Sequence, residues 1–295
     1  MTDEPRELQR PLSTIRNTPM TQRDWSDLLD GEDVAAIESD AGGMVLALED
    51  GQVNLHYGFA DLEELRVDFV PMWQELHSEL ESFEADYVRI DLIQLPDRTW
   101  IEPLLTDISF QPNGEWMEMV ITEADPNMPP PEFPDGVAMR RGGPDDADRI
   151  VEIESEGYGD FSDGEAATRI RVEQAGWIGI LEEDGEAVAY AINDDIESAR
   201  GRVLSAAVDP DAWGKGYGEL MLAAATYQLV ASEARSVSVV VRPEVGQAVR
   251  ATQALGYRPG LRGIEWRRTT DEAEIEARIA DLKERGVKAR FGNWR

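Results

Sequence analysis

Three glycines at alternate positions, lying between an apolar strand and an apolar helix, constrain this chain more than any other feature. They are Gly214, Gly216 and Gly218, and they follow the run 203–208 and the turn residue Pro210. Glycine permits positive φ and lets a ligand approach the backbone closely. The unpaired N–H groups and the dipole of the helix that begins there favour an anion. The segment is therefore predicted to bind a phosphate group, with Lys215, the only lysine in the first 280 residues, inside it.

Two common phosphate loops do not fit this spacing. A P-loop requires Ser or Thr after its lysine, and here Gly216 follows Lys215. The dinucleotide-binding pattern has two residues between its second and third glycines, and here one residue separates them.

The second half of the chain alternates helices and strands. Helices are predicted at 145–155, 165–174, 218–231 and 245–255, the last ending at Gly256, and strands at 177–181, 187–192, 203–208, 237–241 and 264–267. Asp184-Gly185 joins the first two strands as a hairpin. A charged helix is expected at 271–285.

The first half repeats part of this order. A hairpin is predicted from strands 45–48 and 53–57, followed by a helix at 62–83, a strand at 88–92, a helix at 98–108 and a strand at 116–121. Aligning Phe110-Gln111-Pro112 with Tyr257-Arg258-Pro259 superposes strand, helix and final strand in the two halves. The pattern indicates a diverged tandem repeat. The expected domains are 1–122 and 137–270, with a proline-rich linker at 123–136 and a C-terminal helix and basic tail at 271–295.

The glycine segment resembles the acyl-CoA loop of the GNAT N-acetyltransferase superfamily. That loop reads Arg/Gln-x-x-Gly-x-Gly/Ala after a strand that ends in Val-x-Pro. Here Val208-Asp209-Pro210 and the run 213–218 fit, with Trp213 in place of Arg or Gln. The later segment Leu255-Gly256-Tyr257 resembles a second motif of the family. The likeness covers about 137–268. It implies an α/β (α+β) GNAT-like fold, a mixed and mostly antiparallel sheet flanked by helices, preceded by a degenerate GNAT-like domain.

The resemblance implies an acyl-CoA, usually acetyl-CoA, as co-substrate, and a primary amine that attacks the thioester directly. The residues expected to hold it are Ala206, Ala207, Val208, Trp213, Gly214, Lys215, Gly216, Tyr217 and Gly218. A catalytically silent acyl-CoA-binding or interaction module is the alternative.

The family's usual acid and base are not found at the matching positions. Val245 and Thr252 stand where the family often has Asn and an acidic Tyr, and 203–208 contains no carboxylate. Substitutes are Tyr190, Asp194 and Asp195, each of which is also typical of packed or solvated strand positions. No catalytic residue is assigned. The segment 154–165, read as an acidic loop between two helices, lies where the family's acceptor site is.

The first repeat lacks the glycine loop. Its matching segment, 57–64, has one glycine and three acids, so it is predicted to repel phosphate. The N-terminal domain is then expected to be structural or to serve the acceptor side.

Composition limits the partners, membrane segments and metal sites that can be expected of this chain. The formal net charge is −32, with only three lysines and no cysteine, as expected of a halophilic cytoplasmic protein. We expect no nucleic-acid partner, no membrane segment and no secretion signal. With two histidines, His56 and His77, no metal site is expected. A homodimer is an open alternative.

Overall fold

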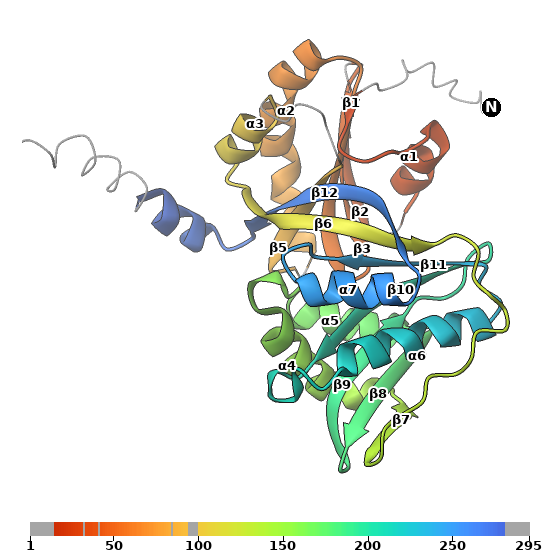
Figure 1. Cartoon of the computed structure of the whole chain (residues 1–295). Coiled ribbons are helices and arrows are strands. Elements are labelled where there is room, and N and C mark those ends of the chain that lie inside the picture. The colour runs from red at the N-terminus through yellow and green to blue at the C-terminus, as the bar shows by residue number, and fades with distance from the viewer. Residues whose placement is uncertain (1–14, 32, 41, 84, 94–99, 281–295) are drawn as a thin grey trace, which may run out of the picture. The chain divides into compact units, whose positions relative to one another are not determined.

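The computed structural model describes residues 15–31, 33–40, 42–83, 85–93 and 100–280 (Figure 1). The chain forms two compact units, each with its own stretch of sheet. The N-terminal unit comprises Met1–Pro112 with Trp266–Arg295, and the C-terminal unit comprises Asn113–Glu265.

The C-terminal unit is a mixed sheet between two pairs of helices. The strand order is β6 (Gln111–Ile121), β11 (Ser236–Val241), β10 (Arg200–Val208), β9 (Glu186–Asn193), β8 (Trp177–Glu183) and β7 (Val137–Arg141). All neighbours are antiparallel except β10 and β11, which are parallel.

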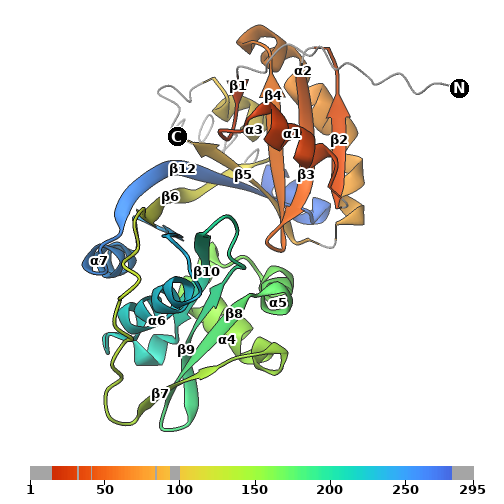
Figure 2. The ribbon, with the colours of Figure 1, turned by 90° about the vertical axis from the view of Figure 1, so that its right-hand side faces the viewer.

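The two faces of this sheet have separate cores. One face packs against α4 (Ala147–Tyr158) and α5 (Glu165–Gln174) through Ile150, Ile153 and Val172. The other packs against α6 (Tyr217–Ala231) and α7 (Gly246–Ala254), with Met221 and Leu229 of α6 in its core. Figure 2 shows α6 and α4 on opposite sides of β8–β10. Apolar side chains on both faces explain why these strands read as continuous apolar runs.

The N-terminal unit has a similar arrangement. Its strand order is β2 (Val34–Glu38), β3 (Gly42–Glu49), β4 (Gln52–Phe59), β5 (Tyr87–Ile93) and the end of β12 (Arg258–Thr269), and β1 (Ile15–Arg16) pairs with β4. The helices are α1 (Gln22–Leu29), α2 (Leu62–Leu76) and α3 (Glu102–Asp107). Tyr57 of β4 packs edge-on against Phe69 of α2, whereas Trp25 of α1 packs against Val45 and Ala47 of β3.

The last strands of the two repeats are exchanged. Both halves run strand, strand, helix, strand, helix, strand, as β3-β4-α2-β5-α3-β6 and β9-β10-α6-β11-α7-β12. β6, which ends the first repeat, pairs with β11 in the C-terminal unit, with Met119 opposite Val239. The end of β12 belongs to the N-terminal unit, where Thr270 N–H donates to Asp86 O. The predicted order of elements is confirmed. The units divide after residues 112 and 265, although 122–136, all described, contains neither helix nor strand.

The predicted hairpins are both present. Their turns have positive φ at both central residues, Asp50 and Gly51 in one and Asp184 and Gly185 in the other, which is the geometry of a type I′ turn. The strands β1, β2 and β7 and the helix α1 were not predicted. The predicted helix 62–83 is α-helical only to Leu76, and a 3₁₀ helix (His77–Ser82) follows.

The extent of α4 differs from the prediction. The helix continues to Tyr158, so Glu154 is helical, as the predicted helix 145–155 has it, and the first part of the segment 154–165 is helix and not loop. Glu154 lies three and four positions from Val151 and Ile150, on the face that packs against the sheet, and packing on that side extends the helix. The predicted helix 271–285 is helical at 272–280. Residues 281–285, the basic tail and residues 98–99 of another predicted helix lie outside the described residues.

Candidate active site

The central feature of the C-terminal unit is an opening between the two parallel strands. β10 and β11 pair from Arg200 and Ser236 to Val203 and Val239, and the pairing stops there. At the same point β10 shifts register against β9, between Val203 and Ser205. Beyond this irregularity β10 keeps only β9 as a strand neighbour, so its other edge faces the opening.

Alternation of hydrogen bonds identifies the groups on that edge. Asp209 N–H donates to Val188 O, 2.9 Å away, on β9. Because antiparallel pairs alternate, Ala207 also turns its backbone groups to β9, whereas Ala206 and Val208 turn theirs away. Of the three predicted strand residues, only Ala206 and Val208 therefore present N–H and C=O groups to the opening.

Two aromatic side chains lie on the carbonyls of this edge. The Tyr158 hydroxyl donates to Ala206 O at 2.9 Å, and Trp213 Nε1 donates to Val208 O at 2.9 Å. Trp213, which replaces the Arg or Gln of the GNAT loop, is 59% exposed. The two side chains mark the two ends of the exposed edge.

The glycine loop adopts the conformation that its sequence predicts. Gly214 and Gly216 have φ of 82° and 84°, and Gly216 caps the start of α6 in the left-handed region. Apart from the adjacent residues of the chain, no described atom lies within 4 Å of a Cβ built on either glycine. The loop backbone at the start of α6 is therefore accessible, as a phosphate site requires.

A carboxylate already lies against the lysine of the loop. Glu183, at the end of β8, accepts from Lys215 Nζ at 2.6 Å and from the Tyr217 hydroxyl at 2.8 Å. The hydrogen bond from Lys215 holds the pKa of Glu183 below its usual value, and Glu183 in turn raises the pKa of Lys215. An anionic ligand that reaches Lys215 must compete with this carboxylate.

A buried polar network beside the opening was missed by sequence reasoning. The Tyr190 hydroxyl donates to the Glu154 carboxylate and lies 2.8 Å from Ser205 Oγ, which itself donates to Glu154 at 3.1 Å. Arg171 Nη1 lies 3.8 Å from Glu154, and its Nη2 lies 2.5 Å from Asp163. The spacing of Glu154 from Ile150 was the available signal, because it places Glu154 on the apolar face of α4.

The other predicted substitutes lie elsewhere. Asp194 bonds Arg202 at 2.8 Å, at the end of β10 away from the glycine loop, and its neighbour Asp195 is exposed. Thr252 is fully buried, and its hydroxyl donates to Ala248 O and Val249 O of its own helix. Val245 precedes α7 and is 43% exposed. Tyr190 alone among the three belongs to the network beside the opening.

The N-terminal unit contains the equivalent opening, and its own chain fills it. β4 and β5 pair only at Val53 with Val88 and at Asn54 with Arg89. Beyond that point Asn17 bridges the strands: its amide donates to Leu55 O at 3.1 Å, accepts from Tyr57 N–H at 2.9 Å, and its backbone carbonyl accepts from Ile93 N–H at 3.1 Å. Asn17 is 2% exposed.

The first helix after this opening is also capped internally. Asp61 precedes α2 and accepts from the N–H groups of Glu63 and Glu64 at 2.8 and 3.0 Å. These N–H groups correspond to those that the glycine loop leaves accessible in the C-terminal unit.

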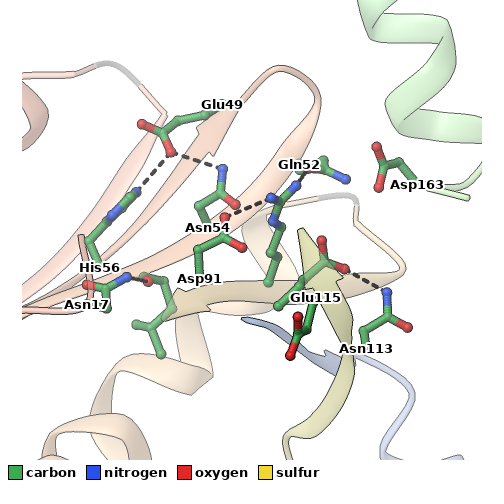
Figure 3. Close-up of polar contacts among 12 residues, drawn as sticks. Asn17, Glu49, Gln52, Asn54, His56, Asp91, Asn113, Glu115 and Asp163 are labelled. Atoms are coloured by element: carbon green, nitrogen blue, oxygen red, sulfur yellow. Dashed lines mark hydrogen bonds and ion pairs between the residues drawn. The ribbon is translucent and has the colours of Figure 1, made fainter. Parts of the chain in front are cut away.

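The sheet face that carries Val45 and Ala47 on β3 is polar where it continues onto β4 and β5. Glu49 accepts from Asn54 and lies 2.9 Å from His56 Nε2, and Arg89 contacts Asp91 and Gln52 (Figure 3).

Across the described residues, no group of three or more His, Cys, Asp or Glu could hold a metal ion. In the same residues, no helix has the length and apolar character of a membrane span.

Comparison with known proteins finds a family match within the C-terminal unit. Residues 147–257 match the family described as "Acetyltransferase (GNAT) family". No curated protein sequence matches the chain significantly.

Solved structures resemble the chain over most of its length. A GCN5-related N-acetyltransferase from Sphaerobacter thermophilus is 18% identical, with a TM-score of 0.58, over 84% of each chain. A second, from Kribbella flavida, is 19% identical, with a TM-score of 0.57, over 83% of this chain and 93% of its own. A tandem GNAT protein from the clavulanic acid biosynthesis pathway is 15% identical, with a TM-score of 0.54, over 81% and 84%. At these identities the likeness shows the fold. Residues 147–257 therefore match the acetyltransferase (GNAT) family, and the chain has the GNAT fold in a two-domain arrangement.

Proposed function

We propose that the C-terminal unit binds acetyl-CoA and transfers its acetyl group to a primary amine. The observation that carries this proposal is the accessible glycine loop at one end of an unpaired strand edge. The N–H groups of the loop and Lys215 would hold the pyrophosphate, and Ala206 and Val208 would pair with the pantetheine arm. The bound thioester supplies the acetyl group, and the strand edge fixes the position of its carbonyl for attack.

The polar groups on the α4 side of β10 favour one side for the amine. Tyr158 and the network behind it lie on the α4 face of β10, whereas Met221 and Leu222 of α6 fill the opposite face with apolar side chains. The polar side is the one that can accept a hydrogen-bonding substrate without leaving buried polar groups unpaired. The acceptor would therefore reach the opening past α4.

A catalytically silent acyl-CoA-binding module is the second candidate. It is favoured by the absence of a carboxylate from β10 and by the engagement of the Thr252 hydroxyl within its own helix. Both candidates require acetyl-CoA binding, and only the first requires turnover.

Two measurements in multimolar salt, where an acidic surface is screened, separate these functions. A titration of the chain with acetyl-CoA, followed by thermal shift and calorimetry, is expected to show saturable binding. Release of free CoA thiol is then measured with a panel of small amines, peptides and lysine-bearing proteins. Binding without release supports the silent module. No binding at any salt concentration contradicts both.

A further inference from the structure

The hydroxyl of Tyr158 occupies a particular place in the opening. Tyr158 is the last residue of α4, and Gly159, with φ of 55°, turns the chain away immediately after it. The hydroxyl donates to Ala206 O, one residue beyond Ser205, where β10 resumes its register with β9. A phenol therefore lies at the point where the exposed edge of β10 begins.

Neighbouring groups fix this phenol and keep it protonated. Burial, and then the Glu154 carboxylate, raise the pKa of Tyr158, and Ser205 lies within hydrogen-bonding reach of its hydroxyl. Ser205 is in turn held by Glu154 and Tyr190. The phenol can therefore carry its proton through the neutral range and yield it only to a basic atom beside it.

Thr252, at the family's usual acid position, cannot donate a proton to a ligand in the opening. Thr252 is fully buried, and its hydroxyl donates its hydrogen bonds to two backbone carbonyls of α7. A reaction in the opening needs another proton donor for the leaving sulfur, because amine attack releases a thiolate.

We propose that Tyr158 is a catalytic residue that relays the proton of the amine to the leaving thiolate. This proposal rests on the proposed acetyl transfer. As the amine nitrogen forms its bond to the acetyl carbon, the carbon–sulfur bond breaks and its electron pair remains on sulfur. Tyr158 gives its phenolic proton to that sulfur and recovers a proton from the attacking nitrogen. The products are the amide and the CoA thiol, and the side chain is unchanged. Ser205 and Glu154 are positioning residues that orient the hydroxyl.

The direct test is Tyr158→Phe, which keeps the ring and removes the relay. With a productive amine we expect kcat to fall about 100-fold, within the range for loss of a positioned acid–base group, while the Kd for acetyl-CoA changes less than about twofold. Tyr227→Phe on α6 is the matched control, because Tyr227 makes none of the hydrogen bonds of the network. It is expected to leave kcat unchanged.

A second readout does not depend on turnover. The ultraviolet absorbance of the thiolate is titrated for CoA bound to each variant. A phenol that donates to the sulfur stabilises the thiolate, so we expect Tyr158→Phe to raise the pKa of the bound thiol by about one unit, a tenfold change in its ionisation. Tyr227→Phe should not move it. Glu154→Gln and Ser205→Ala, checked for folding by thermal denaturation, are expected to give smaller losses in kcat with unchanged acetyl-CoA affinity.

The outcomes separate this role from the overall function. If the wild-type chain releases CoA and Tyr158→Phe does so equally fast with an unshifted thiol pKa, the role of Tyr158 is overturned and acetyl transfer stands. If the wild type binds acetyl-CoA but releases no CoA with any amine, both proposals fall and the silent module remains.

Discussion

The two repeats differ in how they satisfy the backbone groups that are exposed where two parallel strands separate. In each, a pair of parallel strands separates and leaves backbone groups without a strand partner. β10 and β11 part after Val203 and Val239, and β4 and β5 part after Asn54 and Arg89. Buried backbone groups must find partners. In the N-terminal unit Asn17 supplies them from the chain itself. In the C-terminal unit no described strand pairs with β10 beyond Val203 on this edge, and the side chains of Tyr158 and Trp213 contact only its carbonyls, which leaves the N–H groups of Ala206 and Val208 for a ligand.

The helices that follow the openings differ in the same way. Asp61 satisfies the first N–H groups of α2 with its own carboxylate, whereas the residue before α6 is Gly216, which has no side chain to do so. The comparison teaches that a repeat without a ligand site need not leave buried backbone groups without hydrogen-bond partners. Side chains of the same chain can make the hydrogen bonds that the ligand would make.

The largest expected effect is on acetyl-CoA affinity and tests the glycine loop at the start of α6. Gly216→Asp adds a side chain at positive φ and a negative charge at the start of α6. We expect acetyl-CoA affinity to fall about 100-fold or more, since charge repulsion replaces several hydrogen bonds of about 1.5–3 kcal/mol each. Calorimetric titration measures it.

Gly256→Asp is the matched control for Gly216→Asp. Gly256 also has positive φ, 90°, and no described atom outside the adjacent residues near its Cβ position, but it lies after α7. Gly256→Asp therefore imposes the same backbone strain away from the glycine loop. Equal losses of affinity in the two variants would show that strain, and not the phosphate site, is responsible.

The filled opening gives the second prediction. Asn17→Ala leaves Leu55 O and Tyr57 N–H without their side-chain partner. The free energy of unfolding is expected to fall by about 2 kcal/mol, as for a buried hydrogen-bonded amide. The affinity and a stoichiometry of one acetyl-CoA per chain should be unchanged. Denaturant unfolding and calorimetry measure these quantities.

Asn127→Ala provides the reference for that variant. Asn127 is exposed and bonds only Asp125, so its loss should cost less than about 0.5 kcal/mol. Two acetyl-CoA molecules bound per wild-type chain would refute the assignment of the N-terminal opening as filled.

The smallest effects concern the ion pair at the loop. Lys215→Met should weaken acetyl-CoA binding about tenfold, through the loss of one charge-assisted contact. Glu183→Gln removes the competing carboxylate and should strengthen binding about threefold. Since Lys215 holds the pKa of Glu183 below its usual value, the gain should be constant across neutral pH.

The neighbouring Glu186→Gln calibrates the effect of net charge alone. Glu186 begins β9 on the other side of the same turn and is exposed. If both glutamine variants tighten binding equally, the gain reports general repulsion and not competition for Lys215.

Local chemistry made much of this fold predictable. The Asp-Gly turns after Glu49 and Glu183, the positive φ at Gly216 and Gly256, and the helix 165–174 follow from residues close in sequence. The location of the glycine loop between β10 and α6 was predictable for the same reason.

The remaining parts depend on long-range contacts. Asn17 meets its partners 38 and 40 positions away, and Ser205 meets Glu154 across 51. The helical spacing of Glu154 from Ile150 places it on the apolar face of α4, but nothing close in sequence identifies Tyr190 and Ser205 as its partners. β1 and β7 were missed because short strands of mixed polarity, such as Ile15–Arg16 and Val137–Arg141, acquire their structure from the strands beside them.

The exchange of β6 and β12 determines how this chain can be divided. A fragment that begins after the proline-rich segment lacks β6, the strand that covers one edge of β11. A fragment that ends there lacks the end of β12 beside β5. Each piece would expose an unpaired inner strand edge, a template for aggregation, and would regain a full sheet only by associating with the other piece. We therefore expect the two repeats to unfold in a single transition. During synthesis, the sheet of the first repeat can be completed only after the end of β12 has been made.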